Sequence, residues 1–254
     1  MSGFTTPLLD LFRRGDVERD VRLLAARGAL APRAHEQLGL LMLLTVDRDE
    51  EVAAIAEDTL RGIPADSLCA FLAGSDVSTE TKAFFAARGV EPSAAGGDDT
   101  VTEEDATRGE AVTEPPAEDE LSTLQRVAQM SVAERVVAAM KGTREERTIL
   151  IRDSNKLVTV AVLSSPKITE TEVESIARMT TVSEEALRII GRTRAWMKNY
   201  AIMAGLARNP KTPVALSMNL LARLTDKDLK VISTDRNVPD VIRMSARRKL
   251  SADK

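Results

Sequence analysis

The sequence predicts an all-α protein of two helical lobes, and three observations support this fold class. The first is composition: of 254 residues, 43% are hydrophobic but only 3% are aromatic. Leu, Ile, Val, Ala and Met must therefore fill the core, and they suit closely packed helices better than β-sandwiches. The second and third are apolar residues at helical spacing and a set of helix-capping motifs.

Residues 1–92 are predicted to form a lobe of short helices. Asp49 is expected to cap a helix over residues 50–60, and Asp16 to cap the helix that follows it. The tetrapeptide Ala-Ala-Arg-Gly occurs twice, ending at Gly28 and at Gly89. We interpret each copy as a helix end, because glycine is common just beyond a helix C-terminus.

Residues 121–254 carry four capping-box sequences. In this motif a hydroxyl at the helix start accepts a hydrogen bond from the third backbone N–H, and an acid at that position returns one. Apolar residues at helical spacing follow each copy. The four predicted boxes pair Ser131 with Glu134, Thr143 with Glu146, Thr169 with Glu172, and Thr181 with Glu184.

Residues 93–120 separate the two lobes. They contain a Gly-Gly and a Pro-Pro dipeptide, many acids, and only Val101 and Val112 as large apolar residues. Such a segment cannot bury enough apolar surface to offset its ordering entropy. We therefore predict a disordered acidic linker.

Charge divides unevenly among these three parts. Residues 1–92 carry ten Lys/Arg and fifteen Asp/Glu, a net of −5; residues 93–120 carry one Arg and ten acids, a net of −9; residues 121–254 carry twenty-four Lys/Arg and fourteen acids, a net of +10. One hypothesis is that the tethered linker competes with outside ligands for the basic lobe. The alternative is that its charge only keeps the chain soluble.

The second lobe repeats itself at an offset of 44 residues. The segment 155–167 aligns with 199–211, with Asn, Pro and Lys coinciding, and 235–237 echoes 153–155. A period near forty residues is typical of a stacked helical array, here predicted with two helices per unit.

At these residues the chain resembles known α-solenoid families. The turn Asn209-Pro210-Lys211-Thr212-Pro213 resembles that of the leucine-rich repeat variant, and the period and Asp-x-Asn starts resemble HEAT repeats. The resemblance is clearest in residues 150–250. It implies an α-solenoid of HEAT-like helix pairs, a curved stack that mostly binds proteins and sometimes nucleic acids.

The same resemblance has one departure. The repeat-variant type of protein can carry a cysteine-ligated iron–sulfur module, which a single cysteine cannot supply.

Composition also excludes several chemistries. The chain has one cysteine, Cys69, and one histidine, His35, so an internal disulfide and a Cys/His zinc site are both excluded. No phosphate-binding glycine loop is visible. Some DNA glycosylases are built from HEAT-like helices, but no motif here identifies their catalytic acid. We expect no enzyme activity, no cofactor and no metal ion.

The chain is expected to be cytoplasmic. Residues 1–12 contain Asp10 and no sustained apolar core, which speaks against a signal peptide. The most apolar run, 38–46, is far shorter than the roughly 20 residues that a membrane helix needs. We expect no membrane insertion.

Two basic clusters in the second lobe are candidate partner-binding sites. The first holds the only Trp and the only Tyr of the chain, which we expect one turn apart on one helix face. Arg and Trp are enriched in binding hot spots; alternatively, the Trp fills the core where two repeats meet. The second cluster is alternatively a solvated face whose cations complement a helix dipole. The candidates are Arg192, Arg194, Trp196, Lys198 and Tyr200 in the first cluster, and Arg243, Arg247 and Arg248 in the second.

These observations predict a non-catalytic helical-repeat adaptor or scaffold. Its C-terminal solenoid surface is expected to bind a protein partner of acidic character. The alternative is a nucleic-acid-binding protein that uses the same basic lobe. The acidic first lobe and the near absence of stacking aromatics favour the protein partner. The oligomeric state stays open.

Overall fold

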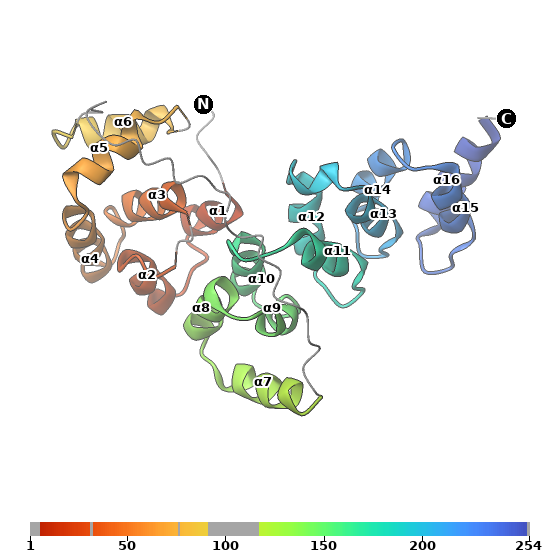
Figure 1. Cartoon of the computed structure of the whole chain (residues 1–254), viewed down its shortest axis with the longest axis horizontal. Coiled ribbons are helices and arrows are strands. Elements are labelled where there is room, and N and C mark those ends of the chain that lie inside the picture. The colour runs from red at the N-terminus through yellow and green to blue at the C-terminus, as the bar shows by residue number, and fades with distance from the viewer. Residues whose placement is uncertain (1–5, 31–32, 76, 91–116, 253–254) are drawn as a thin grey trace. The chain divides into compact units, whose positions relative to one another are not determined.

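The computed structural model describes residues 6–30, 33–75, 77–90 and 117–252. Every regular element in these ranges is a helix, so the predicted all-α class is confirmed. The chain divides into two compact units, Met1–Gln129 and Met130–Lys254, called here unit 1 and unit 2. In Figure 1 the ribbon colour runs from red at the N-terminus, in unit 1, to blue at the C-terminus, in unit 2.

Unit 1 is built around α3, which packs against α1, α2, α4 and α6. Apolar side chains from these helices form its core, with Leu8, Leu40 and Leu41 almost fully buried. The helices are α1 (Pro7–Arg14), α2 (Arg19–Ala26), α3 (Ala34–Leu44), α4 (Glu50–Arg61), α5 (Ala65–Ala73), α6 (Thr79–Ala86) and α7 (Ala117–Gln129).

The helix ends of unit 1 follow the sequence signals, with one exception. Asp49 accepts hydrogen bonds from the backbone N–H groups of Glu51 and Val52, and so caps α4 as predicted. Gly28 and Gly89 have φ angles of 71° and 79° beyond α2 and α6, a region that glycine enters without strain.

The predicted cap at Asp16 is wrong. The helix α2 begins three positions later, behind Glu18, whose side chain makes no capping bond. The intervening Val17 is buried in the core, and Glu18 is extended with ψ 150°. Burial of Val17 therefore takes precedence over the local capping preference of Asp16.

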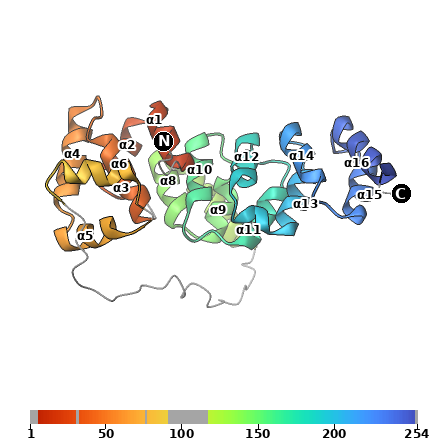
Figure 2. The same ribbon diagram turned by 90° about the horizontal axis from the view of Figure 1, so that it is seen from above.

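Unit 2 packs through helices that are near one another in the chain. α8, α10 and α12 contact in succession, α14 contacts α16, and α11 contacts α13. Figure 2 shows the even-numbered helices along one side of the unit and the odd-numbered ones along the other. The elements are α8 (Val132–Lys141), α9 (Arg144–Leu150), α10 (Lys156–Ser164), α11 (Glu170–Arg178), α12 (Glu184–Arg192), the 3-10 turn η1 (Trp196–Lys198), α13 (Tyr200–Arg208), α14 (Val214–Leu221), α15 (Asp226–Thr234) and α16 (Asp240–Ala252).

Three of the four predicted capping boxes are confirmed with both of their hydrogen bonds. They begin α8, α9 and α11 at Ser131, Thr143 and Thr169. The fourth is wrong, because α12 is capped by Ser183, which accepts from Ala186 N. Val182 is fully buried, and this fixes the helix start just after it rather than at Thr181.

Three helices lie within the 44-residue sequence offset, so this offset relates the even-numbered α10 to the odd-numbered α13. Asn155 and Asn199 occupy equivalent positions and cap α10 and α13. Between these caps lie α10, α11 and α12, which have nine residues each. Helices this short leave room for a third within 44 residues. The predicted helix pairs therefore stay a prediction.

Most of the predicted linker lies outside the described residues, since these resume at 117. Its last four residues, 117–120, differ from the prediction because they form the first turn of α7. Unit 2 begins at Met130, whereas the sequence predicts its lobe from residue 121.

Candidate functional site

The first basic cluster lies on a connection between two helices rather than on one helix. α12 ends at Arg192, η1 follows, and Asn199 then caps α13 by accepting from Ala201 N at 2.9 Å. Asn199 itself is extended, with ψ 118°. The prediction that Trp196 and Tyr200 share a helix face is therefore wrong, because the asparagine cap interrupts the helix between them.

Three cations of this cluster face solvent. Arg192, Arg194 and Lys198 are all exposed. None of them forms an ion pair with any residue in the described part of the chain, where the ion pairs involve other Arg residues. Exposed charges without an internal partner are available to attract an incoming anion.

Trp196 is neither fully buried nor free. It is half-buried in η1, which packs on α12 and α13. The turn is also held from the next loop, where Arg223 Nη2 donates to the carbonyl of Met197 at 3.2 Å. Part of the indole therefore supports the connection and part is open to solvent.

Tyr200 has a structural role. Its ring is 38% exposed, but its hydroxyl donates to Asp228 Oδ2 and accepts from Thr225 N at 3.0 Å. Arg208 Nη2 reaches the other oxygen of Asp228 at 2.5 Å. The Tyr200 hydroxyl, aided by Thr225 and Arg208 and opposed by desolvation, lowers the pKa of Asp228 below its usual value.

The second basic cluster is largely used inside unit 2. Arg243 is paired with Asp240, and Arg247 Nε donates to Ser233 O at 3.1 Å. Lys249 Nζ donates to the carbonyls of Leu221 and Ala222 at 2.9 Å each. These bonds satisfy carbonyls at the ends of α15 and α14, as cations near a helix C-terminus do.

The structure does not bring the two predicted clusters into one contact. Arg248 is the member of the second cluster that is exposed and bonded to no described residue. The second cluster lies on α16, which packs on α14 and α15, whereas η1 packs on α12 and α13. The predicted set therefore splits into an exposed group at 192–198 and an engaged group on α16.

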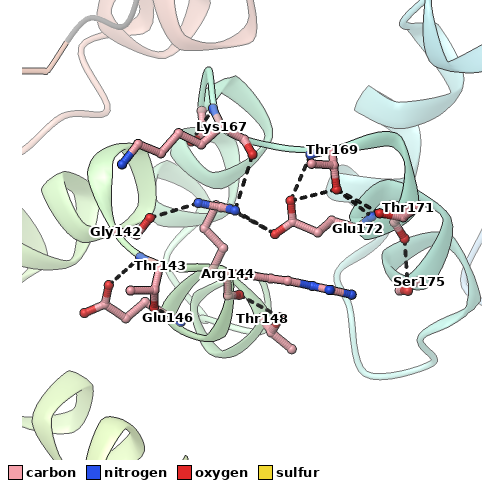
Figure 3. A network of polar contacts seen from close by, with 12 residues as sticks. Gly142, Thr143, Arg144, Glu146, Thr148, Lys167, Thr169, Thr171, Glu172 and Ser175 are labelled. Atoms are coloured by element: carbon pink, nitrogen blue, oxygen red, sulfur yellow. Dashed lines mark hydrogen bonds and ion pairs between the residues drawn. The ribbon is translucent and has the colours of Figure 1, made fainter. Parts of the chain in front are cut away.

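Sequence reasoning missed a buried ion pair between α9 and α11 (Figure 3). The Arg147 and Glu172 side chains are only 7% and 6% exposed, and Arg147 Nη2 lies 2.8 Å from Glu172 Oε1. Arg147 also donates to Gly142 O at 2.9 Å and to Lys167 O at 3.3 Å. The capping box revealed Glu172, but nothing local in the sequence marks Arg147 as its partner.

Two cavities of the units were also not predicted. One of about 390 Å³ lies in unit 1 among α1, α3, α5 and α6, with mostly apolar walls that include Met42, Phe71 and Phe84. One of about 170 Å³ lies between α9 and α11 beside Arg144 and the buried pair. The second is large enough for one side chain.

The described residues offer no further chemistry that we can assign. They contain no group of three or more His, Cys, Asp or Glu placed to hold a metal ion. None of the described helices is long and apolar enough to cross a membrane. The assignable property of the segment 192–198 is its three exposed cations, which can attract an anionic surface.

Comparison with protein-family models, with curated proteins and with solved structures finds no match for this chain. The resemblance to HEAT and repeat-variant units consequently stays a prediction.

Proposed function

We propose that the chain is a non-catalytic adaptor or scaffold that binds an acidic protein partner in the cytoplasm. The observation that carries this proposal is the connection at 192–198, where three exposed cations form no ion pair with any described residue. The adjoining Trp196 is half-buried and adds a rigid apolar contact beside them.

The packing of unit 2 is consistent with the proposal. Its helices contact their neighbours along the chain, as in α-solenoids, where each repeat touches only adjacent repeats. An α-solenoid presents a long surface suited to a polypeptide partner. We therefore propose that unit 2 is a HEAT-like array of this kind.

A nucleic-acid partner is the second candidate, and the charge of unit 2 favours it. Residues 130–254 carry twenty-three Lys/Arg and fourteen acids, a net of +9. Single-stranded nucleic acid is usually bound with aromatic side chains on which bases stack. Here the only Tyr is engaged with Asp228 and the only Trp is half-buried, so we place this candidate second.

The test compares two variants of the full chain that lose the same charge. One is Arg192→Gln/Arg194→Gln/Lys198→Gln. The control is Arg152→Gln/Lys156→Gln/Lys211→Gln, which removes three exposed cations from the turn after α9, the first residue of α10 and the turn before α14. Both variants and the parent chain are used to capture proteins from extract of the native cells, with and without nuclease treatment, and the captured proteins are quantified by mass spectrometry.

We expect a protein that the parent chain and the control capture and that the first variant loses. Equal loss in both variants contradicts a specific surface at 192–198. Loss of all capture on nuclease treatment favours the nucleic-acid candidate.

A further inference from the structure

Four connections of unit 2 lie in succession along one edge. They are the segments that lead into the odd-numbered helices α9, α11, α13 and α15. Figure 2 shows these helices in order along one side of the unit. The connections are residues 142–143, 165–169, 193–199 and 222–225.

Hydrogen bonds join the first connection to the second (Figure 3). Lys167 Nζ donates to Lys141 O at 3.0 Å. Arg147 donates to Gly142 O on one side and to Lys167 O on the other. The buried guanidinium of Arg147 therefore holds the two connections beside each other.

The remaining connections are joined in the same way. Asn199 Nδ2 donates to Glu170 Oε2 at 3.0 Å, which ties the third connection to the start of α11. Arg223 donates to Met197 O, and Thr225 N donates to the Tyr200 hydroxyl. These bonds make the four connections one continuous edge, called here the loop edge.

Unpaired positive charge extends along this edge beyond the three residues of the proposed site. Lys141, Arg144 and Lys167 are exposed and form no ion pair with a described residue. Of the acids near this edge, Glu172 pairs with Arg147, whereas Glu170 accepts from the neutral amide of Asn199 and keeps its charge, and Glu145 forms no ion pair with a described residue. From residue 141 to residue 198 the edge therefore carries six exposed cations that form no ion pair with a described residue, and one of them, Lys167, also donates to Lys141 O.

The other ends of the helices differ in how their charges are used. Arg135 pairs with Asp153, and Arg178 with Glu174. Arg188 lies within ion-pair distance of both Glu184 and Glu185. Free cations remain there at Arg152, Lys156 and Lys211, which makes them matched controls.

We infer that the loop edge binds an extended acidic polypeptide that crosses several connections in succession. The inference rests on the proposed function and adds the shape and length of the bound segment. Packed helices lie about 8–10 Å apart, so four successive helix starts span about 25–30 Å. An extended chain covers this distance with about nine residues.

The test uses two Glu-rich synthetic peptides labelled with fluorescein, at low salt so that surface charges are weakly screened. One has about four residues and spans about 13 Å, and the other has about twelve and spans about 40 Å. Fluorescence anisotropy measures their binding to the full chain and to three variants. The variants are Lys141→Gln/Arg144→Gln, the triple substitution at 192, 194 and 198, and Arg152→Gln/Lys156→Gln.

The triple substitution should weaken both peptides, because the short one is drawn to the connection with three cations. Lys141→Gln/Arg144→Gln should weaken only the long peptide, by about three- to tenfold, since each exposed ion pair contributes about a two- to threefold change. Arg152→Gln/Lys156→Gln should leave both affinities within about twofold.

The outcomes separate the two proposals. If Lys141→Gln/Arg144→Gln leaves the long peptide unaffected, or if the control weakens it equally, the loop edge is not the site of an extended segment. If the triple substitution affects neither peptide, the proposed function itself fails. If a single-stranded oligonucleotide of the same length and charge binds more tightly than the peptide, the ligand of the loop edge is nucleic acid and not an acidic polypeptide.

Discussion

The two basic clusters of unit 2 look alike in sequence but have opposite roles in the structure. The cations on α16 are mostly bonded inside the unit, to Asp240, to Ser233 O and to the carbonyls that end α14. The cations at 192–198 are exposed and form no ion pair with a described residue. The number of charges in a cluster therefore does not predict whether it is available to a partner.

The difference has a local cause. α16 packs against α14 and α15, whose last carbonyls lack partners within their own helices and attract nearby cations. The connection at 192–198 runs from the end of α12 to the start of α13, and its three cations form no ion pair with a described residue. The carbonyls at the ends of α14 and α15 thus engage the cations of α16 that lie beside them.

The largest expected effect comes from the most deeply engaged cation, Arg147. Arg147→Leu strands the carboxylate of Glu172 in a site where it is 6% exposed. Breaking a buried pair in this way costs about 3–5 kcal/mol. Urea unfolding followed by the fluorescence of Trp196, the only Trp of the chain, reports on unit 2.

A second variant separates the stranded charge from lost packing. Arg147→Leu/Glu172→Gln removes the buried carboxylate charge but keeps an oxygen that can accept from Thr169 N. We expect it to recover a large part of the lost stability. A loss below about 1 kcal/mol for Arg147→Leu alone would show that the pair is not buried in solution.

An intermediate effect on stability is expected on α16, where Lys249 donates hydrogen bonds inside unit 2 and its neighbour Arg248 is exposed. Lys249→Met removes two hydrogen bonds to the end of α14 and should destabilise unit 2 by about 1 kcal/mol. Arg248→Met removes an exposed charge and should change stability by less than about 0.5 kcal/mol. Equal effects in the same unfolding experiment would remove the distinction between engaged and free cations.

The smallest effect is expected at Asp228, which Tyr200 and Arg208 engage near the surface. Because the folded state lowers its pKa, its charge contributes stability above the ordinary value of 3.8, and this is lost as the pH falls through the lowered pKa. Asp228→Asn should therefore lower the Tm at pH 7, with the difference shrinking in acid. A Tm difference that stays constant between pH 7 and pH 2 would contradict this linkage.

Local signals allowed much of the fold to be predicted from sequence. The all-α class, three capping boxes and the Asp49 cap all depend on residues within one turn of each other. Their physical basis is the set of unpaired N–H groups at every helix start. Such groups need partners nearby in sequence.

The errors in the prediction arose where burial, or contacts between residues far apart in sequence, determine a helix start or a side chain's partner. The helix starts after Val17 and Val182 are set by core packing. The separation of Trp196 from Tyr200 depends on a cap between them. The use of Lys249 depends on a carbonyl 28 residues away, which no local pattern contains.

The hydrogen bonds that follow α10 and α13 have a consequence for how the chain is made. Ser165 Oγ, just after α10, donates to Met140 O on α8 at 2.9 Å. Asn209 Nδ2, just after α13, donates to Ala177 O on α11 and to Met179 O at 2.9 Å each. Both residues reach back to a helix already synthesised, 25 and 32 residues earlier. A nascent unit 2 can thus dock each helix as it leaves the ribosome, without waiting for the C-terminus.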